Sequence, residues 1–242
     1  MALSEGKYLK CVWALALVLA VFGYGVAVGL YKVFPFQQLQ RVKNSIAGQA
    51  EDCPECGPNM QWSERLAQFR AFPSTSRNVF VGDSITHVAH WDEIFQQHSV
   101  LNRGIGSDKT TDVLARLDTV ISASPQRVFI MMGVNDFNLA KRAVDDVFTD
   151  YIQVIEGLTA KSIDVVIQST IECADCGRAT EQIRRLNLML KGYCDVNGLL
   201  FVDLNRELAD ANGLRKEFQR DGVHPNIAGY KVWAALVEPL LL

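Results

Sequence analysis

The chain has 242 residues, of which 49% are apolar and 21% are charged, and its formal net charge at pH 7 is -3. This length suits one domain with an appendage, and it is enough to bury a core without metals or disulfides. The slightly negative charge argues against a nucleic-acid partner, because proteins that bind nucleic acids carry a basic surface.

The first informative segment is a run of 21 residues, 11–31, without a single Asp, Glu, Lys or Arg. A helix rises about 1.5 Å per residue, so this run can cross a hydrocarbon core of about 30 Å. We therefore predict a transmembrane anchor at 11–31, behind a short tail at 1–10. A cleavable signal peptide fits less well, because no small-residue site closes the run, and a buried helix of the domain is the other alternative. Basic residues flank both ends, so the positive-inside rule does not fix the orientation.

The segment 32–76 is polar and contains four prolines, and we interpret it as a stalk with one helix within 61–72. The remaining residues, 77–242, are expected to form the globular domain.

Four of the six cysteines form two C-x-x-C pairs, Cys53 with Cys56 and Cys173 with Cys176. Disulfides within or between these pairs are the favoured interpretation, and they would place the catalytic domain outside the cytosol, in the periplasm. A zinc site is an alternative, but the pairs are much farther apart than in most zinc-binding folds, and free thiols are another. The remaining two, Cys11 and Cys194, are interpreted as small apolar residues.

The domain alternates short apolar runs with helical patterns. The runs are rich in β-branched residues and nearly continuous, as in parallel strands buried on both faces, and they lie at 78–81, 100–102, 127–132, 164–168 and 199–203. Apolar residues spaced by three and four mark a helix from Val144 to Leu158 and a last helix from Ile227 to Leu240. Five such units predict an α/β/α sandwich on a parallel sheet, with the site at the carboxyl ends of the strands.

Ser84 follows the first strand in the sequence Gly-Asp-Ser-Ile-Thr. A serine at a strand-to-helix turn is well placed as a nucleophile, although a capping turn has the same composition. The base that such a serine needs is found in Asp221-Gly-Val-His224-Pro. Asp221 can orient the imidazole of His224, whereas the rival base His87 has no acid of its own.

Two further segments end strands on the same edge of the sheet. They are Asn-Arg-Gly104-Ile-Gly after the second strand and Gly-Val-Asn135-Asp after the third. The N–H of Gly104 and the amide of Asn135 would join the N–H of Ser84 as donors to an oxyanion.

The ordered set GDS, NxGxG, GxND and DxxHP resembles the four-block pattern of the SGNH/GDSL hydrolases across about 78–242. Within that family, RGIGSDKTTDVLARL is similar to the group containing the platelet-activating-factor acetylhydrolase α-subunits and bacterial relatives. Two departures are Ile85 in place of the usual leucine and Ser107 where a third glycine is common.

The resemblance implies a flavodoxin-like fold and ester or thioester hydrolysis without a metal or cofactor. Ser84, His224 and Asp221 would form the triad, and Ser84, Gly104 and Asn135 the oxyanion hole. The expected substrate is a small acyl ester, chiefly acetyl on a sugar. Lysolipid or thioester hydrolysis, acyl transfer, or non-catalytic polysaccharide binding in an envelope complex are alternatives. The loop after the fourth strand contains Cys173 and Cys176, and a disulfide there would shape acyl access. The sequence does not indicate an oligomeric state.

Overall fold

The computed structural model describes Tyr24, residues 60–174 and residues 176–242. The predicted tail at 1–10 and most of the stalk therefore lie outside the described residues, as does the predicted anchor at 11–31 apart from Tyr24. Within the described part, no helix combines the length and apolar character that crossing a membrane requires. Residues 57–242 form one compact unit, which contains the central sheet and the helices packed on it.

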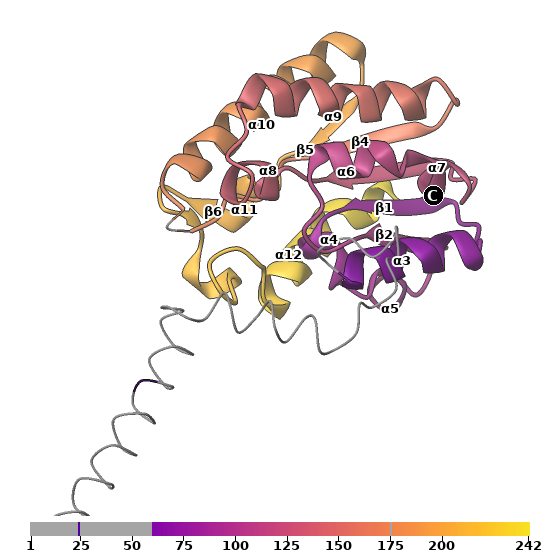
Figure 1. The fold of residues 1–242 in the computed structure, drawn as a ribbon, viewed down its shortest axis with the longest axis horizontal. Coiled ribbons are helices and arrows are strands. Elements are labelled where there is room, and N and C mark those ends of the chain that lie inside the picture. Colours follow the sequence, from indigo (N-terminus) through magenta and orange to yellow (C-terminus); the bar gives the residue numbers. More distant parts are fainter. Residues whose placement is uncertain (1–23, 25–59, 175) are drawn as a thin grey trace, which may run out of the picture. The chain divides into compact units, whose positions relative to one another are not determined.

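A five-stranded parallel sheet forms the centre of the unit, in the order β2-β1-β3-β4-β5 (Figure 1). The strands are β1 (Asn78–Gly82), β2 (Val100–Gly104), β3 (Arg127–Met131), β4 (Asp164–Gln168) and β5 (Leu200–Val202). This strand order is the flavodoxin-like one, with its switch point between β1 and β3, and it confirms the predicted α/β/α sandwich on a parallel sheet.

Burial explains why these strands read as continuous apolar runs. All five residues of β1 are buried, as are the last four of β3 and of β4. Strands covered on both faces have no position for a polar, solvent-facing side chain.

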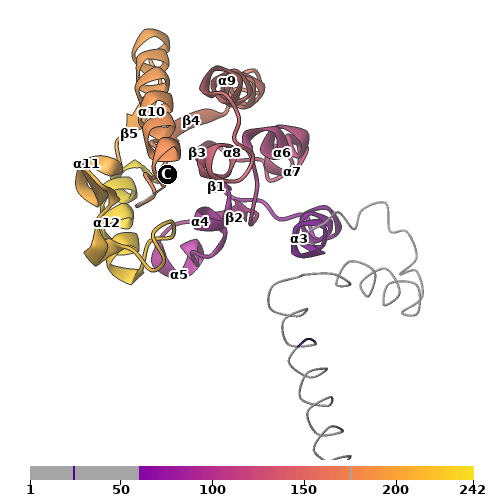
Figure 2. The same cartoon turned by 60° about the vertical axis from the view of Figure 1, so that its left-hand side comes forward.

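Helices cover both faces of the sheet (Figure 2). On one face lie α6 (Thr110–Ala115), α7 (Leu117–Ile121), α9 (Val144–Thr159) and α10 (Arg178–Asn197). On the other lie α5 (Trp91–Ile94) and α12 (Ile227–Val237). Trp91 of α5 stacks on Phe80 of β1 with ring centroids 4.4 Å apart, and it meets Trp233 of α12 edge-on at 4.9 Å. Aromatic packing therefore fixes α12, and with it the segment just before it, over the end of β1.

Three features differ from the sequence prediction. The helix expected within 61–72 is present as α3 (Met60–Ala71), but it is packed on the domain rather than standing in a stalk. A small hairpin of β6 (Ala209–Asp210) and β7 (Gly213–Leu214) follows α11 (Asn205–Leu208) and was not predicted. Ile227, expected on the buried face of the last helix, is 73% exposed because it is the first residue of α12.

Candidate active site

Ser84 lies at the carboxyl end of β1, as the first residue of the four-residue helix α4 (Ser84–His87). The preceding Asp83 caps this helix by accepting a hydrogen bond from the N–H of Ile85 over 2.9 Å. Within the described residues, the backbone N–H of Ser84 donates no hydrogen bond. The turn therefore presents a hydroxyl and an unpaired donor at the same point.

His224 comes from the segment between a 3₁₀ turn at Lys216–Phe218 and α12. Its Nε2 lies 2.9 Å from Ser84 Oγ, and its Nδ1 lies 3.0 Å from both carboxylate oxygens of Asp221. The structure thus brings together the three residues that the sequence proposed for the triad. The rival base His87 makes no hydrogen bond to Ser84 in the described structure.

The carboxylate of Asp221 is held in its ionised form. Partial burial opposes ionisation, but the backbone N–H and ring of His224 and the N–H of Val223 all donate to it. Together these bonds hold the pKa of Asp221 well below its ordinary value. An ionised Asp221 keeps a proton on Nδ1 of His224, which leaves Nε2 as the acceptor that faces Ser84.

A disulfide loop braces this segment. Cys173 and Cys176 are joined by a disulfide, and the N–H of Ala174 between them donates to the carbonyl of Gly222 over 2.7 Å. Gly222 lies between Asp221 and His224, so the disulfide loop contacts the triad segment directly. The other C-x-x-C pair lies outside the described residues.

Gly104 has another role than the one predicted. Its N–H donates to Asn102 Oδ1 over 2.8 Å, so it is not free to bind an oxyanion, and that prediction is corrected. A Cβ at Gly104 would lie 2.5 Å from the backbone nitrogen of His87. Glycine is therefore needed here for the close approach of β2 to α4.

The turn that follows β2 offers donors in place of Gly104. Within the described part of the chain, the N–H groups of Gly106 and Ser107 make no hydrogen bond. A Cβ built on Gly106 would be 4.0 Å from Cβ of Ser84, so this turn lies beside the nucleophile. Ser107 has φ of 69°, in the left-handed region that favours glycine. This explains why a glycine is common at this position in the related sequences.

Asn135 lies in α8 (Val134–Asn138), immediately after β3. Its Nδ2 donates to the carbonyl of Asp108 over 3.0 Å, and its second amide hydrogen is unused in the described structure. The neighbouring Asp136 is fully buried and accepts from the N–H and hydroxyl of Thr110 and from Arg142. Asp136 thereby fixes α8 against α6, a positioning role that the sequence analysis missed.

Asp83 is the second residue near the site whose carboxyl group has a shifted pKa. Burial raises its pKa to about 7, helped by the charges of Asp108 and Asp136 and opposed by the N–H of Ile85. Its Oδ2 has no hydrogen-bond partner among the described residues. The raised value means that the folded protein binds a proton which the unfolded chain releases near pH 4, so folding stability falls as pH rises from about 4 to about 7.

We expect Asp83→Asn to remove this pH dependence, because asparagine still accepts from Ile85 but does not ionise. Relative to the parent protein, its free energy of unfolding should rise by about 4 kcal/mol between pH 4 and pH 8. Urea unfolding at the two pH values measures the difference. The control Asp92→Asn, on the exposed start of α5, should stay within about 0.5 kcal/mol of the parent at both. If the unfolding free energies of Asp83→Asn and the parent differ by the same amount at both pH values, Asp83 does not titrate in this range.

Two cavities lie near the carboxyl edge of the sheet. The first, of about 530 Å³, is bounded by the end of α4 and by α5 on one side and by the start of α12 on the other. Its apolar lining includes Val88, Ile94, Pro225 and Ile227. Val88 donates its N–H to the carbonyl of Ser84, and Pro225 follows His224, so neighbours of the Ser84–His224 pair line this groove, whereas Ser84 and His224 themselves are not among its lining residues.

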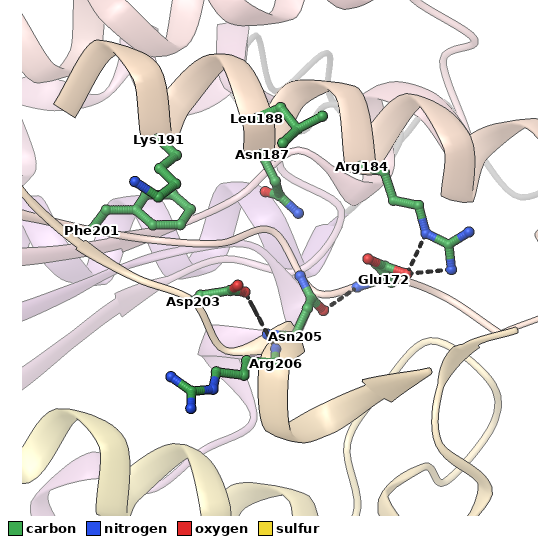
Figure 3. A pocket seen from close by; sticks show the side chains of 9 residues that line it. All are labelled: Glu172, Arg184, Asn187, Leu188, Lys191, Phe201, Asp203, Asn205 and Arg206. Atoms are coloured by element: carbon green, nitrogen blue, oxygen red, sulfur yellow. Dashed lines mark hydrogen bonds and ion pairs between the residues drawn. The ribbon is translucent and has the colours of Figure 1, made fainter. Parts of the chain in front are cut away.

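The second cavity, of about 370 Å³, lies beyond β4 and β5 (Figure 3). Several of its charged and polar groups are engaged with one another: Glu172 pairs with Arg184 at 2.7 Å, and the N–H of Glu172 donates to Asn205. Asn205 in turn donates to Thr170, which fixes the loop after β4. We interpret these groups as structural.

Comparisons with known proteins identify the family of the chain. Residues 80–232 match the family model described as GDSL-like Lipase/Acylhydrolase family. The chain is 30% identical over 175 residues to the rat platelet-activating factor acetylhydrolase IB subunit alpha1, a match that covers 68% of this chain and 74% of the relative.

Solved structures show the same fold. A GDSL-like lipase from Bacteroides thetaiotaomicron superposes with a TM-score of 0.67 at 26% identity, covering 74% of this chain and 96% of that one. A protein described as an acylhydrolase from Bacteroides fragilis superposes with a TM-score of 0.66 at 29% identity, covering 72% and 92%.

Proposed function

The chain belongs to the GDSL-like lipase/acylhydrolase family of ester-hydrolysing serine hydrolases, and we propose that Ser84, His224 and Asp221 carry out its reaction. The observation that supports this most directly is the line of contacts from Ser84 Oγ to His224 Nε2 at 2.9 Å and from His224 Nδ1 to Asp221 at 3.0 Å. Such a chain activates a hydroxyl that is otherwise a weak nucleophile at neutral pH.

In the proposed mechanism, His224 Nε2 takes the proton of Ser84 as Oγ bonds to the acyl carbon. The carbonyl oxygen becomes an oxyanion, and the N–H of Ser84, the amide of Asn135 and an N–H of the Gly106–Ser107 turn stabilise it. When the carbon–oxygen bond to the alcohol breaks, His224 returns the proton to the leaving oxygen. A water molecule then repeats the sequence on the acyl-enzyme and releases the acid and free Ser84.

The groove lined by neighbours of Ser84 and His224 supports a proposal for the substrate. His224 must reach the oxygen of the leaving alcohol, and the groove is lined by the residues that directly follow His224 and by those at the end of α4. Three of its apolar side chains, Val88, Ile94 and Ile227, are exposed. We therefore propose that the groove binds the alcohol portion of the ester and that this portion is apolar.

The acyl group is proposed to be small, chiefly acetyl. The acetylhydrolase relative is named for removing acetyl from platelet-activating factor, a precedent for a short acyl group. Acetylated sugar, expected from the sequence, is kept as the second candidate because the exposed carboxylate of Glu93 also lines the groove and can accept hydrogen bonds from hydroxyl groups.

Ile227→Asp tests the groove. A charge there should lower kcat/KM for hexyl acetate by about tenfold, the effect of losing about 50 Å² of apolar contact, and leave ethyl acetate nearly unchanged. The control Leu188→Asp changes an equally exposed residue on α10 and should affect neither ester. Faster hydrolysis of acetylated sugar than of hexyl acetate, with no effect of Ile227→Asp on hexyl acetate, would instead support a sugar substrate.

We also propose that 11–31 anchors the enzyme in a membrane and that the catalytic domain lies outside the cytosol, in the periplasm. The charge-free run at 11–31 supports the anchor, and the disulfide between Cys173 and Cys176 supports an oxidising compartment. Retention of the protein in membranes washed with alkaline carbonate would support the anchor, and release into the wash would contradict it.

A further inference from the structure

Helix α3 precedes the region that matches the family model, which begins at residue 80. Its inward face packs on the segment that leads from β2 into the Gly106–Ser107 turn. Leu66 and Phe69 of α3 form a buried cluster with Ile105, which is 1% exposed, and Trp62 packs against it. The guanidinium of Arg103, in β2, stacks on Phe69 at 4.4 Å from the ring centroid. One end of the turn is thereby covered by α3.

The other end of the turn is held by a hydrogen bond from the same helix. Trp62 Nε1 donates to Asp108 Oδ1 over 2.5 Å, while Arg116 binds Oδ2 of the same carboxylate. Asp108 is fully buried, so each of these bonds satisfies an oxygen that solvent cannot reach. Loss of the indole N–H would leave Oδ1 without a donor.

Asp108 is also connected to the oxyanion donors. Its carbonyl accepts the amide of Asn135, and its backbone directly follows the free N–H groups of Gly106 and Ser107. Arg116, the other partner of Asp108, reaches the carbonyl of Gly82 at the end of β1, two residues before Ser84. A shift of Asp108 would therefore move both the turn and Asn135 relative to Ser84.

We propose that Trp62 is a positioning residue: through Asp108, helix α3 holds the 105–108 turn and Asn135 in the arrangement that binds the oxyanion. This inference rests on the proposed function, because it assigns the turn and Asn135 to the same oxyanion site. It implies that a segment outside the matched region contributes to the rate of the chemical step and not to substrate binding.

The test is Trp62→Phe in the full chain, which removes the N–H and keeps an aromatic ring for packing. We expect kcat for p-nitrophenyl acetate to fall about tenfold, less than the loss of about 10²- to 10³-fold when a donor is removed outright, with KM changing less than about twofold. The pH midpoint of kcat/KM should not move, since the His224–Asp221 pair is untouched. The matched control is Tyr151→Phe in α9, which removes a buried hydroxyl that donates to the carbonyl of Ile130, keeps the aromatic ring and should lower stability without lowering kcat.

A double-mutant cycle with Asn135→Ala separates positioning from general destabilisation. In the Asn135→Ala background, Trp62→Phe should lower kcat by less than about threefold, because one of the two donors it positions is already missing. All rates are measured well below each variant's Tm. An unchanged kcat in Trp62→Phe, or the same fold-change in both backgrounds, would overturn the inference. Activity retained by Ser84→Ala would instead overturn the proposed function.

Discussion

Replacing Ser84 with alanine is expected to lower kcat for p-nitrophenyl acetate by about 10⁵-fold or more, the scale seen when a triad nucleophile is removed. Alanine deletes only Oγ, which lies 2.9 Å from His224 Nε2, and it leaves the capping bond between Asp83 and Ile85 in place. Thermal unfolding should therefore be nearly unchanged. Rates of ester hydrolysis and Tm together distinguish loss of the nucleophile from loss of the fold.

The matched control is Ser74→Ala, at an exposed serine before β1 whose hydroxyl, among the described residues, hydrogen-bonds only to the carbonyl of Phe72. It should keep the full rate. If Ser84→Ala retains a rate within tenfold of the parent, the nucleophile is another residue and the triad assignment is wrong.

The second large effect is expected at Asn135. Asn135→Ala should lower kcat by about 10²- to 10³-fold, with little change in KM, because an oxyanion donor acts mainly in the transition state. Part of the loss in kcat comes from Asp108, because its carbonyl would lose the hydrogen bond of 3.0 Å that the Asn135 amide donates to it.

Asn138→Ala is the control for this change, since Asn138 is in the same helix α8 and its side chain makes no hydrogen bond in the described structure. Its kcat should equal that of the parent. A fall in kcat at Asn138 as large as at Asn135 would point to damage to α8 rather than to loss of a donor.

The sheet was predictable because its strands are buried on both faces, and buried parallel strands read as continuous apolar runs. The five runs appear in the structure as β1 to β5, with ends that differ by at most two residues. The proximity of Ser84 to His224 was also predictable, since the fold fixes the positions of the carboxyl end of β1 and the start of α12. The small hairpin of β6 and β7 was not predictable, because its two-residue strands are too short to show an alternation of apolar and polar residues.

The oxyanion donors were only partly predictable, because they depend on single hydrogen bonds. The motif predicts the N–H of Gly104 as a donor, but this N–H donates to the side chain of Asn102, two residues earlier. The free N–H groups at Gly106 and Ser107 follow from a left-handed residue at 107, and a serine there gives no sequence signal for that conformation.

Long-range contacts explain the remaining differences. Polar composition and prolines suggested a stalk up to residue 76, yet Trp62, Leu66 and Phe69 are spaced as one apolar face of a helix. That face packs on Ile105, a contact that spacing alone does not specify. Ile227 fits the apolar period of α12 but lines the open groove, because residues at the first turn of a helix extend beyond the core.

The central claim is that Ser84 is a nucleophile activated by His224, and covalent labelling tests it most directly. The full-length protein is treated with a fluorophosphonate and digested, and the modified residue is located by mass spectrometry. We expect one label on Ser84, lost in Ser84→Ala and strongly slowed in His224→Ala, since Nε2 of His224 takes the proton of Oγ. A folded protein that takes up no label, or that is labelled at another residue, would contradict the claim.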